Sequence, residues 1–286
     1  MKILYINIGM HPKNLHALFN YNIYINYCYS TDLDSINLNE YDVVYSPSQP
    51  INVNKYPNTK FIFGPHFSVF PESNHMNLIK GNNSVYIQPS EWAKNAWIND
   101  PICQNIRFET LPFGVDIEKF KPVKPIYERN KVFIYYKRRH PNELKALYQF
   151  LISKNINPKI FNYVTKYPEN EYVNYLKESR FGIWLTAHES QGFALEEALS
   201  CDVPLLIWNV TSMNQEYNSN YKDIKATTIP YWDNRCGEYF TNFNELPNAF
   251  TTFISKLNQY KPREYITENL SFDKCKSKLI EIINKI

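Results

Sequence analysis

Short apolar runs alternate with longer polar segments along the first third of the chain. These runs cover residues 2–8, 42–45, 60–63 and 85–87, and each is followed by turn-forming residues. Runs of this kind are typical of buried strands, and the longer segments between them predict crossovers in a parallel sheet. Binding residues collect at the carboxyl ends of the strands in such a sheet. His11 and His66, which follow two of the runs, are therefore candidates for a site.

A second and clearer alternation follows the segment Lys121–Pro125, which is rich in Pro and Lys and predicts a linker. The pattern predicts strands at 131–136, 159–163, 181–185 and 205–208, with helices at 141–155, 169–179 and 193–201. This alternation of strand and helix is typical of an α/β fold. Residues 271–286 carry apolar side chains at helical spacing and predict a final helix. The chain is thus expected to form two α/β halves joined near residue 122.

The composition narrows the class of protein. A chain of 286 residues is long enough for one large or two small domains. Apolar residues make up 44% and charged residues 21%, which excludes a disordered or collagen-like chain. Five cysteines, without a CxxC pair, favour neither a disulfide framework nor a zinc site, so we expect a reducing, cytoplasmic compartment. No apolar run reaches the ~18 residues of a membrane span, and the first residues do not resemble a signal peptide.

The net charge of +3 is small and its cations are scattered, so we do not expect nucleic acid as a partner. Peripheral association with a membrane stays open. The letters Asp32–Leu33–Asp34 match a metal-binding DxD pattern, but such short matches are common. We expect no bound metal and no cofactor.

The most informative segment is 188–208, HESQGFALEEALSCDVPLLIW. A predicted strand runs into a loop, and a helix begins near Gly192. The positive end of a helix favours an anion such as a diphosphate, and a glycine there lets a ligand approach closely. Glu189 and Glu197 flank that helix start, and a carboxylate accepts two hydrogen bonds from a vicinal diol. The alternative is a surface helix capped near Ser190 with solvated glutamates.

This segment resembles the E-x7-E signature of retaining GT-B glycosyltransferases of the family 4 type. The pattern is a Glu, then Gly-Phe, then Glu-Ala, then a Pro before the next strand, and here it is carried by Glu189, Gly192–Phe193, Glu197–Ala198 and Pro204. Two further segments resemble the same family: 111–122 (LPFGVDIEKFKP) is similar to its interdomain crossover, and 88–92 (QPSEW) to a strand end in its N-terminal domain. Together the likeness covers roughly residues 60–286.

The resemblance implies a fold and a donor site. The fold would be α/β of GT-B type, with two Rossmann-like domains facing a cleft and a C-terminal helix that crosses back to the N-terminal domain. The domains would be 1–122 on the acceptor side, 123–262 for the nucleotide sugar, and 263–286 for the returning helix. The resemblance also implies roles for five positions: Glu197 would hold the ribose, Glu189 the donor sugar, and backbone amides near Gly192, Phe193 and Ala194 the sugar or the phosphates.

Three cations follow the predicted strand 131–136. Lys137, Arg138 and Arg139 would face the cleft, and Lys or Arg there can neutralise a diphosphate leaving group. In an extended chain Lys137 and Arg139 share a face and Arg138 points away. The alternatives are a solvated basic turn or a nucleic-acid patch. The family usually has Gly-Arg here and a later Lys-Gly, which this sequence lacks, so any of the three could contact the diphosphate.

Three histidines accompany these groups. His66 follows a predicted strand where the family often has a histidine lining the cleft, and it could bind the donor sugar or help deprotonate the acceptor. His11 lies in the loop that the family uses near the phosphate and acceptor. His188 precedes Glu189 and either contacts the sugar or orients the loop. For each histidine a structural role is the alternative.

The sequence therefore predicts a metal-independent retaining glycosyltransferase. It would move a sugar from a UDP- or GDP-sugar to an acceptor hydroxyl, expected to be on a glycan. Two alternatives remain: a DNA-modifying glucosyltransferase, and a non-catalytic protein that binds sugar nucleotides.

Overall fold

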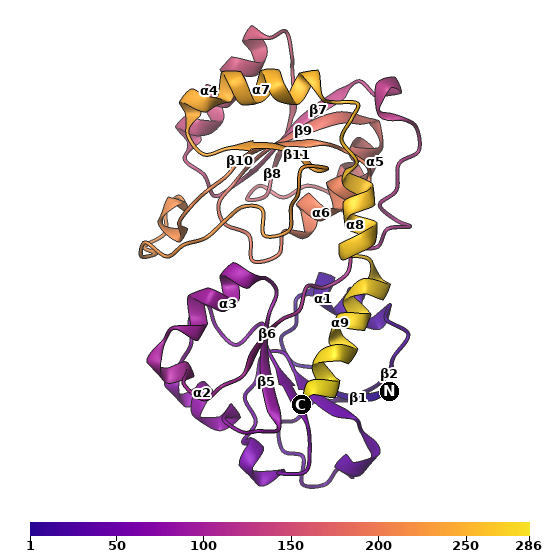
Figure 1. Ribbon diagram of the computed structural model, residues 1–286, viewed down its shortest axis with the longest axis vertical. Helices are drawn as coiled ribbons and strands as arrows, with labels where there is room; N and C mark the ends of the chain where they lie inside the picture. The colour runs from indigo at the N-terminus through magenta and orange to yellow at the C-terminus, as the bar shows by residue number, and fades with distance from the viewer. The chain divides into compact units, whose positions relative to one another are not determined.

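The chain folds into two compact units, seen in Figure 1 of the computed structural model, which describes all residues from 1 to 286. The first unit comprises 1–114 and 272–286, and the second comprises 115–271. The sequence placed the first boundary at 122 and the start of the returning segment at 263. At the boundary the Val115 N–H donates to the Leu270 carbonyl at 2.8 Å, and Val115 pairs with Ser271 in a parallel bridge. The two connecting segments thus run side by side.

The first unit is built on a six-stranded parallel sheet in the order β2-β1-β3-β4-β5-β6. Its strands are β1 (Lys2–Ile6), β2 (Tyr24–Cys28), β3 (Val43–Ser46), β4 (Phe61–Phe63), β5 (Ser84–Gln88) and β6 (Phe108–Thr110). Its helices are α1 (Pro12–Phe19), α2 (Ser73–Ile79), α3 (Glu91–Ile98) and α9 (Phe272–Lys285). The central strands are buried on both faces, which is why they appear in the sequence as unbroken apolar runs.

Helix α9 belongs to the first unit although it is the last element of the chain. Its apolar face buries Cys275, Leu279, Ile282 and Ile283. Two cations hold its last turn: Lys60 Nζ donates to the Ile283 carbonyl at 3.0 Å, and Arg107 donates to the Lys285 carbonyl at 2.6 Å. Cations are favourable at a helix C-terminus because the last carbonyls lack partners within the helix.

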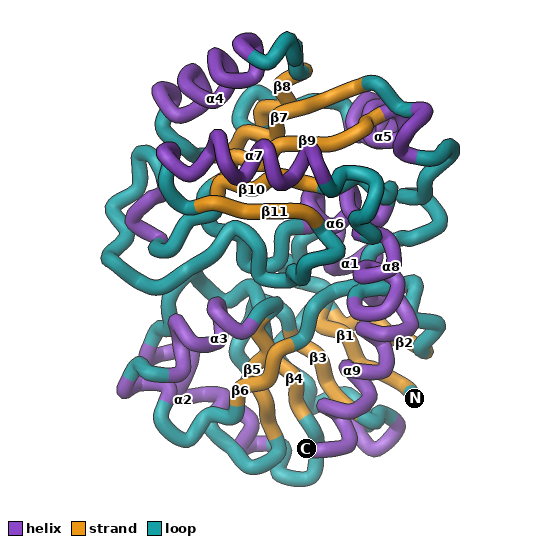
Figure 2. Tube along the Cα trace, turned by 45° about the horizontal axis from the view of Figure 1, so that its top comes forward, coloured by secondary structure: helices purple, strands orange, loops and turns teal.

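The second unit carries a five-stranded parallel sheet in the order β11-β10-β9-β7-β8. Its strands are β7 (Lys131–Lys137), β8 (Lys159–Asn162), β9 (Ser179–Thr186), β10 (Leu205–Trp208) and β11 (Gly237–Phe240). Its helices are α4 (Pro141–Ser153), α5 (Glu169–Glu178), α6 (Phe193–Ser200), α7 (Leu246–Ser255) and α8 (Pro262–Asn269). Figure 2 shows these strands together with the helices that cover them.

Alternation along β7 divides the second core into two layers. Ile134 and Tyr136 join a cluster that includes Leu147 of α4 and Phe250 of α7. The side chain of Phe133 points to the opposite face and packs edge-on against aromatic rings of β8, β9 and α5. Because successive side chains of a strand point to opposite faces, one strand builds both layers.

The expected α/β fold with two parallel sheets is confirmed. The predicted strands of the second half lie within one or two residues of the observed β7 to β10. The pattern missed β2, β6, β11 and the helices α1, α2, α3, α7 and α8. No helix of the structure combines the length and apolar character that crossing a membrane requires.

Candidate active site

Three strands of the second unit end at one edge of its sheet. Lys137 is the last residue of β7, Thr186 ends β9, and Trp208 ends β10. The N–H of Ala187 donates to the Lys137 carbonyl at 2.9 Å, which joins the end of β7 to the loop 187–192. This is the edge at which parallel sheets bind their ligands.

Lys137 and Glu189 form an ion pair at this edge. Lys137 Nζ lies 2.8 Å from Glu189 Oε2, and the two side chains are 22% and 11% exposed. The ammonium also lies 4.7 Å from the centre of the Tyr163 ring, in the loop after β8. The structure therefore brings together one predicted cation and one predicted carboxylate, and both side chains remain partly exposed.

Helix α6 begins directly beside this pair. Gly192 is its N-cap residue and has a left-handed φ of 96°, which glycine adopts without the penalty of a Cβ atom. A Cβ built on Gly192 would lie 3.5 Å from Glu189 Cβ, so the glycine and the glutamate are neighbours. The first turn of a helix directs N–H groups away from the helix, and these are suited to an anion. Phe193 and Ala194 provide that turn.

Glu197 lies one helical turn further along α6 and is 4% exposed. Its neighbour Glu196 is fully buried and accepts a hydrogen bond from Gln191 at 3.0 Å. Burial raises the pKa of the Glu196 carboxyl well above its ordinary value, and the nearby charges of Glu197 and Glu189 add to the shift. The alternative of a surface helix requires both glutamates to be solvated. Glu196 and Glu197 are instead both buried.

Two tyrosines lie near these carboxylates. The hydroxyl of Tyr167 donates to that of Tyr135 at 2.9 Å. Burial raises the pKa of Tyr135, and the charges of Tyr167, Glu189 and Glu197 raise it further. Tyr135 is held rigidly, because its ring stacks on Trp184 with 4.2 Å between the ring centres. The edge thus combines charged groups with fixed aromatic ones.

Arg138 points to a different partner from Lys137. Its guanidinium lies 2.8 Å from Glu216 Oε1, and its side chain is 52% exposed. The other oxygen of Glu216 lies 3.4 Å from His188 Nε2. Arg138 has a left-handed φ of 52°, so the chain does not stay extended after β7. The condition of an extended chain, under which Lys137 and Arg139 would share a face, is therefore not met.

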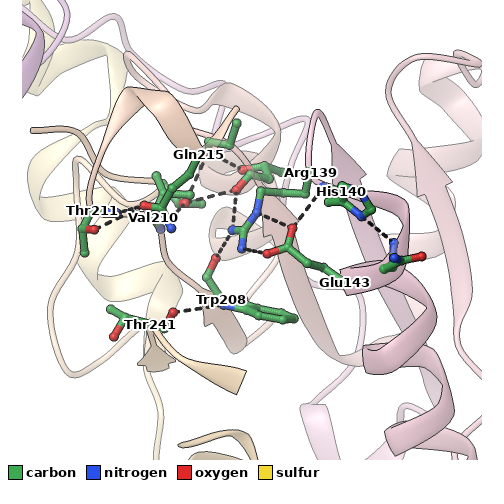
Figure 3. Close-up of polar contacts among 12 residues, drawn as sticks. Arg139, His140, Glu143, Trp208, Val210, Thr211, Gln215 and Thr241 are labelled. Carbon is green, nitrogen blue, oxygen red and sulfur yellow. Dashed lines mark hydrogen bonds and ion pairs between the residues drawn. The ribbon is translucent and has the colours of Figure 1, made fainter. Parts of the chain in front are cut away.

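Arg139 turns into the protein interior and is 1% exposed (Figure 3). It forms a bidentate pair with Glu143 of α4 at 2.9 and 2.6 Å. It also donates to the carbonyls of Thr186 and Trp208 at 3.3 and 3.1 Å. These contacts tie the start of α4 to the ends of β9 and β10. Arg139 thus supports the strand ends from the protein interior. Lys137 and Arg138 remain as the cations at the surface of this edge.

The two remaining predicted histidines lie in the first unit. His11 caps α1 by accepting the N–H of Lys13 at 3.2 Å. His66 Nε2 lies 3.3 Å from Asn14 Nδ2, and its backbone N–H donates to the Pro47 carbonyl at 2.8 Å. Burial lowers the pKa of His66 to about 4, with a further contribution from His11. His66 is therefore neutral at pH 7.

Sequence reasoning missed Glu216. It lies 8% exposed in the loop after β10, directly after the short 3₁₀ turn Met213–Gln215. The rule that ligands gather at the carboxyl ends of parallel strands would have drawn attention to this loop. Nothing in the local sequence, however, predicts that Glu216 folds back to Arg138 and His188.

Comparisons with known proteins show the fold. No family model and no curated protein sequence matches the chain. A glycosyltransferase structure from Rickettsia africae ESF-5 matches over 99% of this chain and 98% of that one, with a TM-score of 0.60 and 12% identity. The catalytic domain of starch synthase IV from Arabidopsis thaliana matches over 86% of this chain and 73% of its own, with a TM-score of 0.48 and 8% identity. A DNA-modifying β-glucosyltransferase matches with a TM-score of 0.46 and 12% identity, over 99% of this chain and 100% of that one. The chain has the α/β fold, of GT-B type, of the Rickettsia glycosyltransferase.

Proposed function

We propose that the protein is a retaining glycosyltransferase that uses a nucleotide-diphospho-sugar, a UDP- or GDP-sugar, as donor. The observation that carries this proposal is the Lys137–Glu189 pair beside the start of α6. A cation and a helix N-terminus suit a diphosphate, and the adjacent carboxylate suits sugar hydroxyls. The resemblance to the E-x7-E signature supports the same assignment.

Each group has a role in the proposed reaction. Lys137, Arg138 and the first turn of α6 stabilise the negative charge that develops on the leaving diphosphate. Glu189 binds the donor sugar, and Glu197 binds the ribose. The acceptor attacks from the face that the diphosphate leaves, and a phosphate oxygen takes the acceptor's proton. No side chain of the protein needs to form a bond to the sugar.

We expect the first unit to bind the acceptor. His66 is neutral at pH 7, so its ring can donate a hydrogen bond to a sugar hydroxyl or accept one from it. His11 lies near enough to influence its pKa. We propose a glycan hydroxyl as the acceptor. The cations of the second unit take the place of a metal in this reaction, so EDTA should not affect it.

A thermal-shift panel of nucleotide sugars in EDTA tests the donor site. We expect one donor to raise the melting temperature of the wild type, because a ligand that binds only the folded state stabilises it. We expect Glu197→Gln and Lys137→Met to lose that shift. Lys159→Met is the matched control, because Lys159 starts β8 and pairs with Glu171 at the surface. A well-folded wild type that no nucleotide sugar stabilises would contradict the proposal.

A further inference from the structure

One carboxylate, that of Glu216, lies between two potential cations. Its Oε1 is 2.8 Å from Arg138, and its Oε2 is 3.4 Å from His188 Nε2. The Glu216 side chain is 7% exposed, that of His188 14%, and that of Arg138 52%. A buried carboxylate requires a compensating charge. In the structure the compensating charge comes from Arg138, the most exposed of the three.

The loop that carries Glu216 is held rigidly. Ser212 and Gln215 close a reciprocal capping box around the 3₁₀ turn Met213–Gln215. Gln215 also accepts the N–H of Thr211 at 2.7 Å, a contact drawn in Figure 3. The N–H of Tyr217 donates to the Arg138 carbonyl at 2.9 Å. The backbone on both sides of Glu216 is therefore fixed, while the long side chain of Arg138 can turn.

His188 is surrounded by groups of both signs. Burial lowers its pKa, the carboxylates of Glu216 and Glu189 oppose that shift, and Lys137 adds to it. The ring of Tyr221 packs against it with 5.6 Å between the centres. A diphosphate bound by Lys137 and Arg138 would add negative charge to this group. Such charge favours the protonated form of a histidine.

We propose that Glu216 is a positioning residue of the donor site. When the diphosphate binds, Arg138 leaves Glu216 and pairs with the phosphates, and a protonated His188 becomes the ion-pair partner of Glu216. The inference rests on the function proposed above. It makes donor binding a proton-coupled step: one proton moves from solvent to His188 as the diphosphate takes Arg138. Arg138 then donates its exposed N–H groups to the phosphates, and the positive charge of His188 compensates the carboxylate of Glu216.

The test is isothermal titration of UDP-glucose, GDP-mannose and ADP-glucose, in buffers of different ionisation enthalpy, between pH 6 and pH 8. The diphosphate of a nucleotide sugar does not change its charge in this range, so proton uptake reports on the protein. We expect uptake of up to one proton and an affinity about tenfold higher at pH 6 than at pH 8. Glu216→Gln and His188→Gln should each abolish the uptake and flatten the pH profile.

Matched controls are Glu72→Gln and His75→Gln, because Glu72 at the N-cap of α2 and His75 within α2 form another Glu–His pair, with 3.8 Å between Oε2 and Nδ1. They should leave uptake and pH profile unchanged, and Glu216→Asp, which restores the charge, should restore part of the uptake. His188→Gln provides an independent test should Glu216→Gln fail to fold. A donor that binds wild type without proton uptake, or with uptake that persists in His188→Gln, overturns this inference and leaves the proposed function standing. If no nucleotide sugar binds the wild type, both are overturned.

Discussion

At the scale of single residues, three consecutive cations have three different environments. Lys137 pairs with Glu189 at the sheet edge, Arg138 pairs with Glu216, and Arg139 is buried against Glu143. The left-handed φ of Arg138 separates them, because it turns the chain out of the extended conformation. The different environments of these similar side chains thus follow from the change in backbone direction at Arg138.

Arg139→Met should destabilise the protein by about 3 kcal/mol. The substitution removes the guanidinium that pairs with Glu143 and donates to the carbonyls of Thr186 and Trp208, and breaking a buried ion pair is costly. Urea denaturation measures the change in the free energy of unfolding. Arg180→Met, at an exposed position of β9, should stay within about 0.5 kcal/mol of wild type. Equal effects of the two substitutions would contradict the structural role of Arg139.

Protonation of His66 should lower the free energy of unfolding of the protein at acid pH. The pKa of this histidine is lowered from 6.5 to about 4 in the folded state, so the unfolded state binds the proton more readily between these values. Stability should therefore fall as the pH drops from 6.5 towards 4, by up to about 3 kcal/mol from this residue. Urea denaturation at pH 7 and pH 4.5 should show a smaller loss for His66→Gln than for wild type. The exposed His16 on α1 gives a control, His16→Gln, that should keep the wild-type loss.

At the scale of elements, the start of α6 joins the fold to the proposed chemistry. The loop 187–192 leaves β9 beside the end of β7, and Gly192 turns it into the helix with a left-handed φ. Because α6 is buried over most of its length, its first turn is fixed relative to the sheet. The helix end can therefore present its N–H groups at a defined place.

Gly192→Ala should weaken donor binding while leaving the protein folded. The nearest atom to the added Cβ is at an ordinary contact distance of 3.5 Å, so the stability loss should be about 1–2 kcal/mol, set by the left-handed backbone. We expect donor affinity to drop by about tenfold or more, since the methyl group lies where a ligand would approach. Gly237→Ala serves as the contrast, because its Cβ would collide with the Leu205 carbonyl oxygen and should disrupt the pairing of β10 with β11. Unchanged donor affinity in Gly192→Ala would argue against a ligand at this helix end.

At the scale of the whole molecule, the central strands of both sheets were predictable from the sequence, whereas of the four edge strands β2, β6, β8 and β11 only β8 was predicted. β7, β9 and β10 appear as apolar runs because helices cover both of their faces. β2 lies at the edge of its sheet and mixes exposed tyrosines with partly buried residues, so its sequence shows no apolar run. Burial on both faces therefore made the central strands visible in the sequence, while the short β6, although mostly buried, was missed.

The residues of the candidate site also fall into those that the sequence indicated and those that it did not. Glu189, Gly192 and Glu197 lie around the start of α6, where the local sequence and the resemblance to the E-x7-E signature both pointed, whereas the sequence left open which of the three cations at 137–139 would contact a ligand. The burial of Arg139 and the return of Glu216 to Arg138 depend on loops that fold over long separations in sequence. No local pattern encodes those contacts, and only the folded chain brings them together.

The most direct test of the central claim is proton NMR of the wild type with the nucleotide sugar that binds it and a glycan acceptor, in EDTA. We predict release of the nucleoside diphosphate, a product with the same anomeric configuration as the donor, and a rate at least about 100-fold lower for Lys137→Met. Binding without cleavage of the donor would show a protein that only binds sugar nucleotides, and an inverted product would contradict the retaining reaction.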